Sequence, residues 1–426
     1  MQNDEPAATR PTGARIEAEV AVVGTGLAGL AAALALAAMG VRVALCGPRL
    51  DGPAMARDTR STALFGPSLT LLDRIGVLDG IAREAVPLVG LRIIDATGRL
   101  LSAPEVLFEA HEVGRDAFGS NIENVALMRA LTECADRAHG LRWAGSTVSQ
   151  IAVCDRDVRL TLDDGREVAC RLVVGADGAG SPSRRAAGIG TTGWSYPQVA
   201  IASRFAHERP HRGISTELHR RSGPLTTVPL PGSQSSLVWV ETPVEAQRLM
   251  GLDASAFAHE LEQCLGGVLG AVSDVGPRAA FPLTGVVADR LGARRVALVG
   301  EAGHRLPPIG AQGLNLGLRD VAWLADLVAG ALARGHDPGG EDLLAAYDRC
   351  RRGDVASRLG VVDALNRSLF AGLMPLDLLR GAGLAALQAV GPLRRLFMRE
   401  GMAPAGPLPA LMRPLCETAA CGSPGA

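Results

Sequence analysis

The chain has 426 residues, of which 47% are hydrophobic and 20% are charged. These proportions are those of a globular protein, and the length favours two closely joined domains over one small core. The formal net charge is −1, which gives no reason to expect a nucleic-acid partner. All 43 basic residues are arginine, so the chain has no lysine that could form a Schiff base or act as an acid.

The eight cysteines are scattered through the sequence and form neither a CxxC pair nor a Cys/His cluster at metal-ligand spacing. We therefore expect no metal site and a reducing, cytoplasmic compartment. Residues 1–16 are polar and contain two prolines, so we expect a disordered segment without a signal peptide. The longest apolar runs, such as Leu27–Met39, are too short to span a bilayer.

The first strand-like run, residues 18–23, leads into the sequence Gly24-Thr25-Gly26-Leu27-Ala28-Gly29 and then into an apolar, helix-like run. A strand, a Gly-x-Gly-x-x-Gly turn and a helix in this order predict a βα unit that binds a dinucleotide. Gly24 would allow the tight turn, Gly26 would let a pyrophosphate approach the backbone, and Gly29 would let the helix pack on the strand. The phosphates would lie at the helix N-terminus, where free N–H groups and the helix dipole favour negative charge.

The alternative interpretation is a glycine-rich turn in another kind of α/β protein, since the chain contains 52 glycines. A second strand-like run, Val41–Cys46, follows at the expected distance and favours dinucleotide binding. The loop beyond it holds Arg60, which could neutralise a pyrophosphate or be a solvated surface cation; the residues alone favour the surface cation. A helix is predicted over Ser68–Ile75, ended by Gly76.

The middle of the chain predicts strands around a second glycine-rich turn. Residues 90–100 predict a strand pair that leaves the first domain, and Asn121–Leu131 predicts a helix that returns to it. Residues 141–174 are predicted as strands and end in a buried run, which is followed by Asp177 and Gly178. An open α/β sheet places ligand contacts at this end of a strand, but an ordinary Asp-Gly turn fits equally well.

From about residue 195 to 285 the pattern changes to short alternating strands, with a helix over Ala254–Leu265. We interpret this region as a second sheet domain inserted in the first. The chain then returns to a buried strand, 295–299, a loop rich in glycine and proline, and a helix over Leu314–Ala333 whose N-terminus would face that loop. The tail from residue 354 is predicted to be helical.

Three separated motifs point to one family: the Gly24–Gly29 turn, Gly175–Gly178 with Ser181 and Arg184, and Gly300–His304 running into Pro308–Asn315. Their order and spacing resemble the group A flavoprotein monooxygenases, the para-hydroxybenzoate hydroxylase-like superfamily. Within it, the sequence looks most like the ubiquinone-biosynthesis hydroxylases. That likeness extends from about residue 17 to 400 and includes Asp58-Thr59-Arg60, Ala63-Leu64, Ile122-Glu123-Asn124 before Leu127, residues 207–211 and residues 315–320.

The resemblance implies an α/β fold with a Rossmann-like FAD-binding domain of the glutathione-reductase type. This discontinuous domain would comprise residues 17–90, 115–190 and 285–345. An inserted β-sheet substrate domain would comprise residues 91–114 and 191–284. Helices would follow over 346–410, and a flexible tail over 411–426.

The resemblance also implies FAD as the cofactor. Matched by position, the expected FAD-binding residues are Gly24, Gly26, Leu27, Ala28, Gly29, Arg60, Asn124, Asp177, Gly178, Glu301, Gly313, Leu314 and Asn315. Two positions depart from the family pattern. Gly47 stands where a Glu usually bonds the adenosine ribose, and Glu301 stands where an Asp is usual. A missing ribose hydrogen bond would weaken FAD binding by about 1 kcal/mol unless water replaces it.

The implied reaction is hydroxylation of a phenolic ring. FAD would be reduced by NAD(P)H or another donor that binds transiently, since no second nucleotide fingerprint is present. Reaction with O2 would give a flavin C4a-hydroperoxide, which an electron-rich ring attacks. The resemblance favours a polyprenylated phenol of ubiquinone biosynthesis as the substrate, and the low aromatic content, 3%, suits a pocket for a prenyl tail.

The catalytic residues are not assigned by sequence. His304 is a candidate base beside the flavin loop, but a structural hydrogen bond to that loop is the favoured interpretation. The apolar stretch Leu369–Leu387 predicts either a peripheral contact with the inner face of the membrane or core packing. Two alternatives stay open for the whole chain: a hydroxylase of another aromatic substrate, or a non-catalytic partner in a biosynthetic complex with weak FAD occupancy. A ubiquinone-biosynthesis protein complex is also an expected partner of the hydroxylase.

Overall fold

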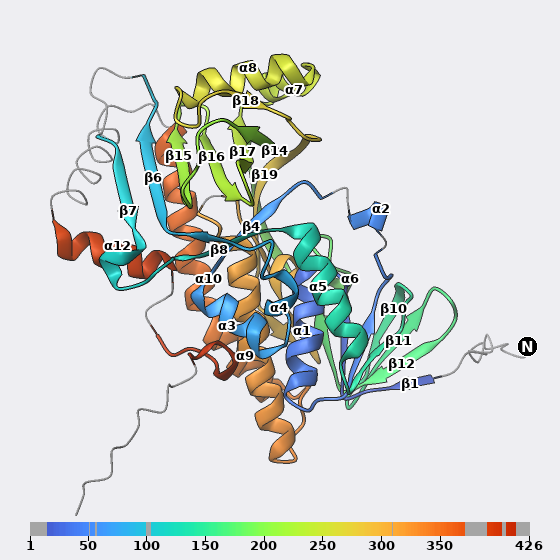
Figure 1. Cartoon of the computed structure of the whole chain (residues 1–426). Coiled ribbons are helices and arrows are strands. Elements are labelled where there is room, and N and C mark those ends of the chain that lie inside the picture. The colour runs from blue at the N-terminus through green and yellow to red at the C-terminus, as the bar shows by residue number, and fades with distance from the viewer. Residues whose placement is uncertain are drawn as a thin grey trace, which may run out of the picture.

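The computed structural model of the chain describes residues 15–50, 52–55, 58–98, 104–308, 310–370, 390–402 and 406–414. These residues form several sheets flanked by helices (Figure 1). Most of the expected disordered N-terminal segment, the apolar stretch beyond residue 370 and most of the expected tail lie outside the described residues. Arg15 and Ile16, which were expected to be disordered, belong to strand β1 (Arg15–Glu17).

A mostly parallel sheet, here called the nucleotide sheet, has the strand order β20-β21-β13-β2-β3-β9. Every residue of β2, β3 and β13 is buried, as is usual for strands that are covered on both faces. Within this sheet β20 pairs antiparallel to β21, and the other pairs are parallel. Its strands are β2 (Val20–Val23), β3 (Val43–Cys46), β9 (Leu141–Trp143), β13 (Leu172–Gly175), β20 (Gly292–Ala293) and β21 (Val296–Leu298).

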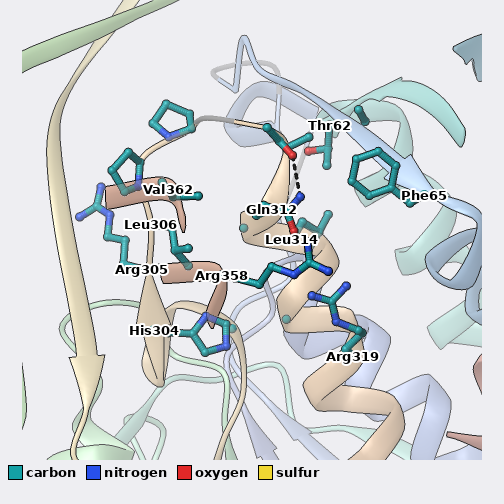
Figure 2. Close-up of a pocket in the computed structure, with 18 of the residues that line it drawn as sticks. Thr62, Phe65, His304, Arg305, Leu306, Gln312, Leu314, Arg319, Arg358 and Val362 are labelled. Atoms are coloured by element: carbon teal, nitrogen blue, oxygen red, sulfur yellow. Dashed lines mark hydrogen bonds between the residues drawn. The ribbon is translucent and has the colours of Figure 1, made fainter. Parts of the chain in front are cut away.

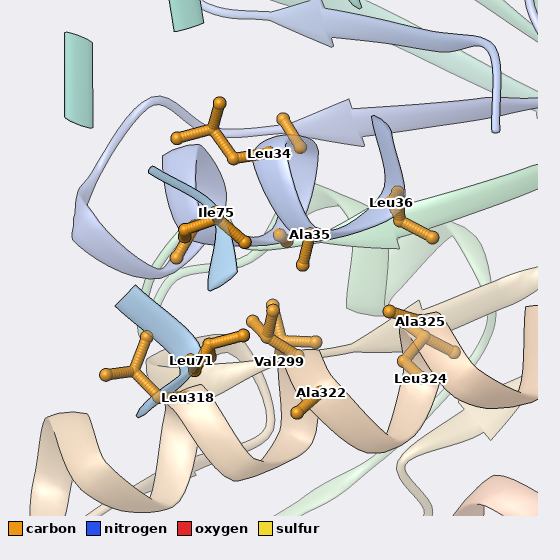
Figure 3. Packing of buried hydrophobic residues seen from close by; sticks show 14 of the residues in the cluster. Leu34, Ala35, Leu36, Leu71, Ile75, Val299, Leu318, Ala322, Leu324 and Ala325 are labelled. Carbon is orange, nitrogen blue, oxygen red and sulfur yellow. The ribbon is translucent and has the colours of Figure 1, made fainter. Parts of the chain in front are cut away.

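Helices cover one face of the nucleotide sheet and a second sheet covers the other. The helices are α1 (Leu27–Ala38), α5 (Asn124–Arg137) and α9 (Gln312–Ala333), whose apolar side chains share one core with alternate residues of β2, β3 and β13. Figure 3 shows Ala35 and Leu36 of α1 pointing toward α9, where Ala322 and Ala325 lie. The covering sheet has the order β1-β12-β11-β10, with β10 (Val148–Val153), β11 (Val158–Leu162) and β12 (Glu167–Cys170).

A small sheet of β4 (Ser61–Phe65), β8 (Gly119–Glu123) and β5 (Val86–Leu88) links the first domain to the rest. The helix predicted from Asn121 begins only at Asn124, because residues 121–123 pair with β4. The buried Asn121 side chain also donates a hydrogen bond of 2.9 Å to Pro229 O. The helix predicted over Ser68–Ile75 is α3 (Gly66–Arg74), which begins earlier because Pro67 is favourable in its first turn. Short helices α2 (Gly52–Met55) and α4 (Leu78–Ile81) lie on either side of it in sequence.

A larger sheet, here called the substrate sheet, has the order β22-β19-β14-β17-β16-β15-β6-β7, with β18 paired to β14. Helices α7 (Pro243–Gly251) and α8 (Ala254–Leu265) cover one of its faces (Figure 1). Strands β6 and β15 are far apart in sequence but pair in parallel. The strands are β6 (Gly90–Asp95), β7 (Val106–Glu109), β14 (Thr191–His207), β15 (Ile214–His219), β16 (Pro224–Leu230), β17 (Gln234–Glu241), β18 (Val272–Ser273), β19 (Ala279–Ala288) and β22 (His304–Arg305).

Beyond α9, helix α10 (Glu341–Phe370) begins before the predicted start at residue 354, since Glu341 and Asp342 provide the acidic first turn that stabilises a helix N-terminus. Helix α12 (Gly391–Met402) and the short 3-10 turn η3 (Ala410–Met412) follow. Further short helical elements are η1 (Ala110–Val113), α6 (Pro182–Ala186) and η2 (Gly300–Ala302). In the part of the chain that the structure describes, no helix has the length and apolar character needed to cross a membrane.

Candidate active site

A cavity of about 1290 Å³ lies between the nucleotide sheet and the substrate sheet. This is more than the roughly 300–1,000 Å³ usual for a small-molecule pocket, so it has room for a large cofactor together with a substrate. The expected site residues that line it are Gly26, Leu27, Ala28, Arg60, Asn124, Gly178, Glu301, His304, Gly313 and Leu314. Among the described residues, the expected Gly24, Gly29, Asp177 and Asn315 do not line it.

The three glycines of the first turn have two roles: two of them pack against other backbone atoms, and one borders open space. Gly24 has φ +112°, and a Cβ atom there would overlap with the carbonyl oxygen of Ala176, which follows the neighbouring strand β13. A Cβ atom on Gly29 would overlap with Gly24 O. A Cβ atom on Gly26 would have no atom within 4 Å, because this residue borders the cavity. Two glycines therefore serve close packing, and the third keeps the approach to the backbone open.

The N-terminus of α1 faces the cavity at Gly26, Leu27 and Ala28. Its N-cap residue, Gly26, has no side chain, and no side-chain hydrogen bond caps the helix. The first N–H groups of the helix are therefore available to a ligand, and the helix dipole favours an anion there.

The carboxylate of the second glycine motif, Asp177, forms its hydrogen bonds within the motif's own turn. Asp177 accepts hydrogen bonds from Ser181 Oγ and from the backbone N–H of Ser183, the latter at 2.8 Å. The buried Arg184 donates to Ala302 O and Ala179 O, both at 2.8 Å, and so ties the motif to η2. The residues that the motif presents to the cavity are Ala176 and Gly178.

The loop cation Arg60 is held by a neighbouring carboxylate. Its Nε and Nη2 atoms each donate to Asp58 at 2.7 Å, and Asn124 Nδ2 donates to the same carboxylate at 3.0 Å. Burial raises the pKa of Asp58, but the hydrogen bonds and charge of Arg60 outweigh it and hold the pKa below its usual range. Arg60 is half-exposed yet lines the cavity, so it is neither a purely solvated cation nor a free one. The sequence signal that could have revealed Asp58 as the partner of Arg60 is its position two residues before that arginine.

The two departures from the family pattern lie in different surroundings. Glu301 of η2 lines the cavity, is exposed, and forms no ion pair or hydrogen bond with the residues that the structure describes. Gly47 does not line the cavity; it has φ +146°, and a Cβ atom there would lie 2.8 Å from Thr25 Cγ2. Its carbonyl oxygen accepts a hydrogen bond of 3.1 Å from Trp143 Nε1. Any residue with a side chain at position 47 would therefore have to displace the Thr25 side chain.

The third motif shapes the N-terminus of α9 through a buried amide, Asn315. Its Nδ2 donates to Ala311 O at 2.7 Å and to Ala63 O at 2.8 Å. Its Oδ1 accepts from Phe65 N at 3.0 Å and from Ser68 Oγ at 2.7 Å. Asn315 thereby fixes β4 and α3 against the first turn of α9, and Gly313 and Leu314 present that turn to the cavity.

His304 borders the cavity at a buried position. Its Nε2 lies 2.6 Å from Asp320 Oδ2, so its partner is a carboxylate of α9 and not the loop that we expected. Asp320 also accepts from Gly300 N at 3.1 Å and from Arg351 Nε at 2.7 Å. Burial raises the pKa of Asp320, but the opposing charges of His304 and Arg351 lower it below the usual range. His304 Nδ1 has no hydrogen-bond partner among the described residues.

Sequence reasoning missed the arginine cluster beside His304. Arg319 Nε and Arg351 Nη1 each donate to Asp354 at 2.8 Å, and Arg358 Nε lies 3.6 Å from the same carboxylate. Burial lowers the pKa of Arg319, and the charges of Arg351 and Arg358 lower it further, although Asp354 opposes both. Figure 2 shows Arg319 and Arg358 reaching toward one another beside the cavity. The only sequence signal for this arginine cluster was the charged pair Arg319-Asp320 at the end of the 315–320 motif.

The substrate sheet forms the far wall of the cavity, and most of this wall is apolar. A few polar side chains interrupt it, and sequence reasoning missed all of them except His304 because they come from several strands. The polar members are Ser215, Glu217, Thr226, Ser236, Thr284 and, on β22, His304 and Arg305; the apolar members include Leu91, Phe108, Val228, Val238, Phe281 and Leu283. In the part of the chain that the structure describes, no group of three or more His, Cys, Asp or Glu residues could hold a metal ion.

Comparison with known proteins supports the motifs. Residues 17–359 match the family described as FAD binding domain. Ubiquinone hydroxylase UbiL of Rhodospirillum rubrum is 39% identical, with 94% of this chain and 93% of the relative covered. The 3-demethoxyubiquinol 3-hydroxylase of Escherichia coli is 31% identical, with 90% of this chain and 98% of the relative covered.

The fold is likewise that of known structures. The crystal structure of p-nitrophenol 4-monooxygenase PnpA from Pseudomonas putida superposes with a TM-score of 0.73 at 20% identity, covering 91% of this chain and 98% of that one. The predicted fold class and FAD cofactor are confirmed. The chain therefore belongs to the FAD-binding-domain family, as an FAD-dependent monooxygenase of the group that includes the ubiquinone hydroxylases.

Proposed function

We propose that this monooxygenase hydroxylates the aromatic ring of a polyprenylated phenol in ubiquinone biosynthesis, with FAD and O2. The observation that carries the proposal is a continuous cavity, which runs from the uncapped N-terminus of α1 to the apolar wall of the substrate sheet. Two relatives named as ubiquinone or demethoxyubiquinol hydroxylases, each matched over 90% or more of this chain, support the substrate class.

The residues at the nucleotide end fit FAD. The space beside Gly26 and the uncapped N–H groups of α1 suit a pyrophosphate, which binds at helix N-termini through these same groups. In this proposal Gly26, Leu27, Ala28, Gly178 and the other expected site residues that line the cavity contact FAD directly. Gly24, Gly29, Asp177 and Asn315 act on FAD indirectly, by fixing the turns that contact it.

Bound FAD, once reduced, supplies the activation of O2 and the transfer of one oxygen atom to the ring. The protein's own residues supply position and environment. Gly313 and Leu314 present the N-terminus of α9, which has no side-chain cap, and this stabilises negative charge on a ligand placed there. The apolar wall, including Val228, Val238 and Leu283, excludes water from the reaction and accommodates an apolar substrate.

His304 is in this proposal a positioning residue. Its Nε2 is engaged by the buried carboxylate of Asp320, so its ring is fixed at the junction of β22 and α9. Because Asp320 also binds the backbone of η2, the same carboxylate fixes the segment that carries Glu301.

The electron donor and the cellular setting are also proposed. NAD(P)H or another reductant would bind transiently. Since a polyprenylated substrate resides in the membrane, the protein would act as a peripheral protein at its inner face, alone or within a ubiquinone-biosynthesis complex. We further propose that the chain is divided into the FAD-binding domain, the substrate-sheet domain and the C-terminal helices with the ranges predicted from the sequence.

The testing experiment combines two measurements. Cells that lack this gene are expected to accumulate an under-hydroxylated prenylphenol, and the purified protein is expected to show a flavin absorption spectrum. A normal quinone profile from cells lacking the gene, with a flavin-loaded protein that hydroxylates other phenols, would refute the proposed pathway. A protein that stays colourless after addition of FAD would favour a non-catalytic partner.

A further inference from the structure

Strand β15 places a carboxylate, Glu217, on the substrate wall of the cavity. Side chains alternate along the strand, and Leu218 packs with Trp239 and Phe257 in the core beneath α7 and α8. Ser215 and Glu217 therefore point to the opposite face, where both line the cavity.

The surroundings of Glu217 are mostly apolar. Its cross-strand neighbours are Thr226 on β16 and Ile93 on β6. Leu91, Phe108 and Val238 also line the cavity; Leu91 pairs with Ser215, and Val238 pairs with Thr226. The side chain of Glu217 is only 12% exposed. A carboxylate in such a place loses much of its hydration, and this is costly unless a partner compensates.

The partner is His219, two residues further along the same face. His219 Nε2 lies 2.7 Å from Glu217 Oε1, and the imidazole is 5% exposed. Its Nδ1 is buried without a hydrogen-bond partner among the described residues. The contact through His219 Nε2 fixes the orientation of the Glu217 carboxylate.

The second oxygen of the carboxylate is left for a ligand. Glu217 Oε2 has no hydrogen bond or ion pair with any residue that the structure describes, and it is not enclosed by protein atoms. An oriented anionic acceptor at an apolar cavity wall selects a ligand that brings a hydrogen-bond donor.

We propose that Glu217, held by His219, accepts a hydrogen bond from the phenolic hydroxyl group of the substrate. This assignment rests on the proposed function and adds the group that orients the ring. The O–H donates to Oε2, and no covalent bond is broken. Such a bond also draws the proton from the phenol oxygen and enriches the ring in electrons. A substrate whose hydroxyl group is blocked as a methyl ether is disfavoured, because it leaves the carboxylate without a partner.

The test uses the full-length, FAD-loaded protein with two probes, 2-prenylphenol and its methyl ether. Binding is measured from the change in the flavin absorption spectrum. The wild-type protein is expected to bind the phenol at least about tenfold more tightly than the ether, as is typical of a hydrogen bond to a charged group. Glu217→Leu is expected to abolish this preference by weakening phenol binding, with ether binding unchanged or improved.

Thr226→Val is the matched control, because it changes a neighbouring polar side chain on the same wall and keeps its shape. It is expected to leave the preference intact. Glu217→Gln keeps the shape and removes the charge; it is expected to reduce the preference several-fold and carries the test should the leucine variant fail to fold.

The possible failures can be told apart. Hydroxylation of 2-prenylphenol with an unchanged phenol preference in both Glu217 variants would overturn the role of Glu217 alone. Equal loss of preference in Thr226→Val would show that the polar side chains of the wall in general, and not the carboxylate in particular, select the phenol. A flavin-loaded wild-type protein that hydroxylates no prenylphenol would overturn the proposed function itself.

Discussion

The two walls of the cavity are built in different ways. On the nucleotide side, backbone groups face the cavity at Gly26, Gly178 and Gly313, and residues behind them fix the turns. On the substrate side, side chains from β6, β15, β16, β17 and β19 form the surface. The first wall depends on a few short, contiguous motifs. The second depends on single residues that only the folded sheet brings together.

This difference separates two kinds of mutation. A change in the residues that fix the turns of the nucleotide wall affects folding and cofactor binding together, because the shape of these turns serves both. A change in the substrate wall affects the choice of ligand and leaves the fold largely intact, because the side chains that form this wall point into the cavity. The following variants test where this division holds, from the largest expected effect to the smallest.

The buried carboxylate Asp320 supports both walls, and Asp320→Asn is expected to have the largest effect. It leaves the buried Arg351 and His304 without one counter-charge, and breaking a buried pair in this way typically costs about 3–5 kcal/mol of folding free energy. Chemical denaturation measures the loss. Glu84→Gln, which removes an exposed partner of Arg129, is the control and should cost less than about 1 kcal/mol. Equal stabilities for the two variants would show that the buried network contributes little.

The same network predicts the dependence of stability on pH. The pKa values of Asp58, Asp320 and Asp354 are lowered in the folded protein. Their contribution is therefore complete above the unfolded pKa of about 3.9 and is lost as the pH falls through the lower, folded values. The free energy of unfolding of the wild type should decrease as the pH falls below about 4. Asp320→Asn should show a shallower decrease; an identical slope would contradict this assignment.

Gly24→Ala and Gly26→Ala separate packing from ligand access within one turn. Gly24→Ala places a Cβ against Ala176 O at a positive φ and should cost about 3 kcal/mol or more. Gly26 has φ −73° and open space, so its alanine variant should change stability by less than about 1 kcal/mol. That variant should nevertheless retain less FAD after purification. Thermal unfolding and flavin content give both readouts, and normal flavin content in Gly26→Ala would place the phosphates elsewhere.

Asn315→Leu tests whether a residue behind the nucleotide wall controls FAD binding. The leucine leaves two carbonyl oxygens and a backbone N–H without their amide partner, which should cost about 2 kcal/mol. Because the first turn of α9 is then free to shift, FAD affinity should fall as well. Fluorescence titration with FAD measures this. Unchanged affinity in a destabilised variant would mean that Asn315 supports the fold alone.

Arg60→Gln is expected to have the smallest effect on stability. The Arg60–Asp58 pair is half-exposed, so its loss should cost less than about 1 kcal/mol. FAD affinity should fall, since the variant removes a cation from the cavity. Titration with FAD at low and high salt measures both the loss and its screening. An affinity for FAD equal to that of the wild type would show that Arg60 is a surface cation without a role in FAD binding.

The sequence was informative where function depends on contiguous backbone. The Gly24–Gly29 turn, the Asp177-Gly178 turn and the α9 N-terminus were all predicted, because each carries its own glycine signature and the first two directly follow a buried strand. The helix over 254–265 was predicted with its observed limits, since its N-cap Asp253 and its C-cap Gly266 stand at its ends.

The roles of the side chains were harder to predict. Asp177 and Asn315 stand in recognisable motifs, yet both carry out their hydrogen bonding within the protein. Nothing in the sequence could pair His304 with Asp320 or Glu217 with the cavity. The first pair depends on a helix packing against a two-residue strand, and the second on which face of β15 is covered by α7 and α8.

The parallel pairing of β6 with β15 has a consequence for how the chain assembles. All the residues between Asp95 and Ile214, including β8, β9 and β13, lie between these paired strands in sequence. The edge of the substrate sheet therefore closes only after a long loop has been brought together, a kind of contact that slows folding. Refolding should pass through a slow, late step, and neither wall of the cavity can be produced as one uninterrupted fragment.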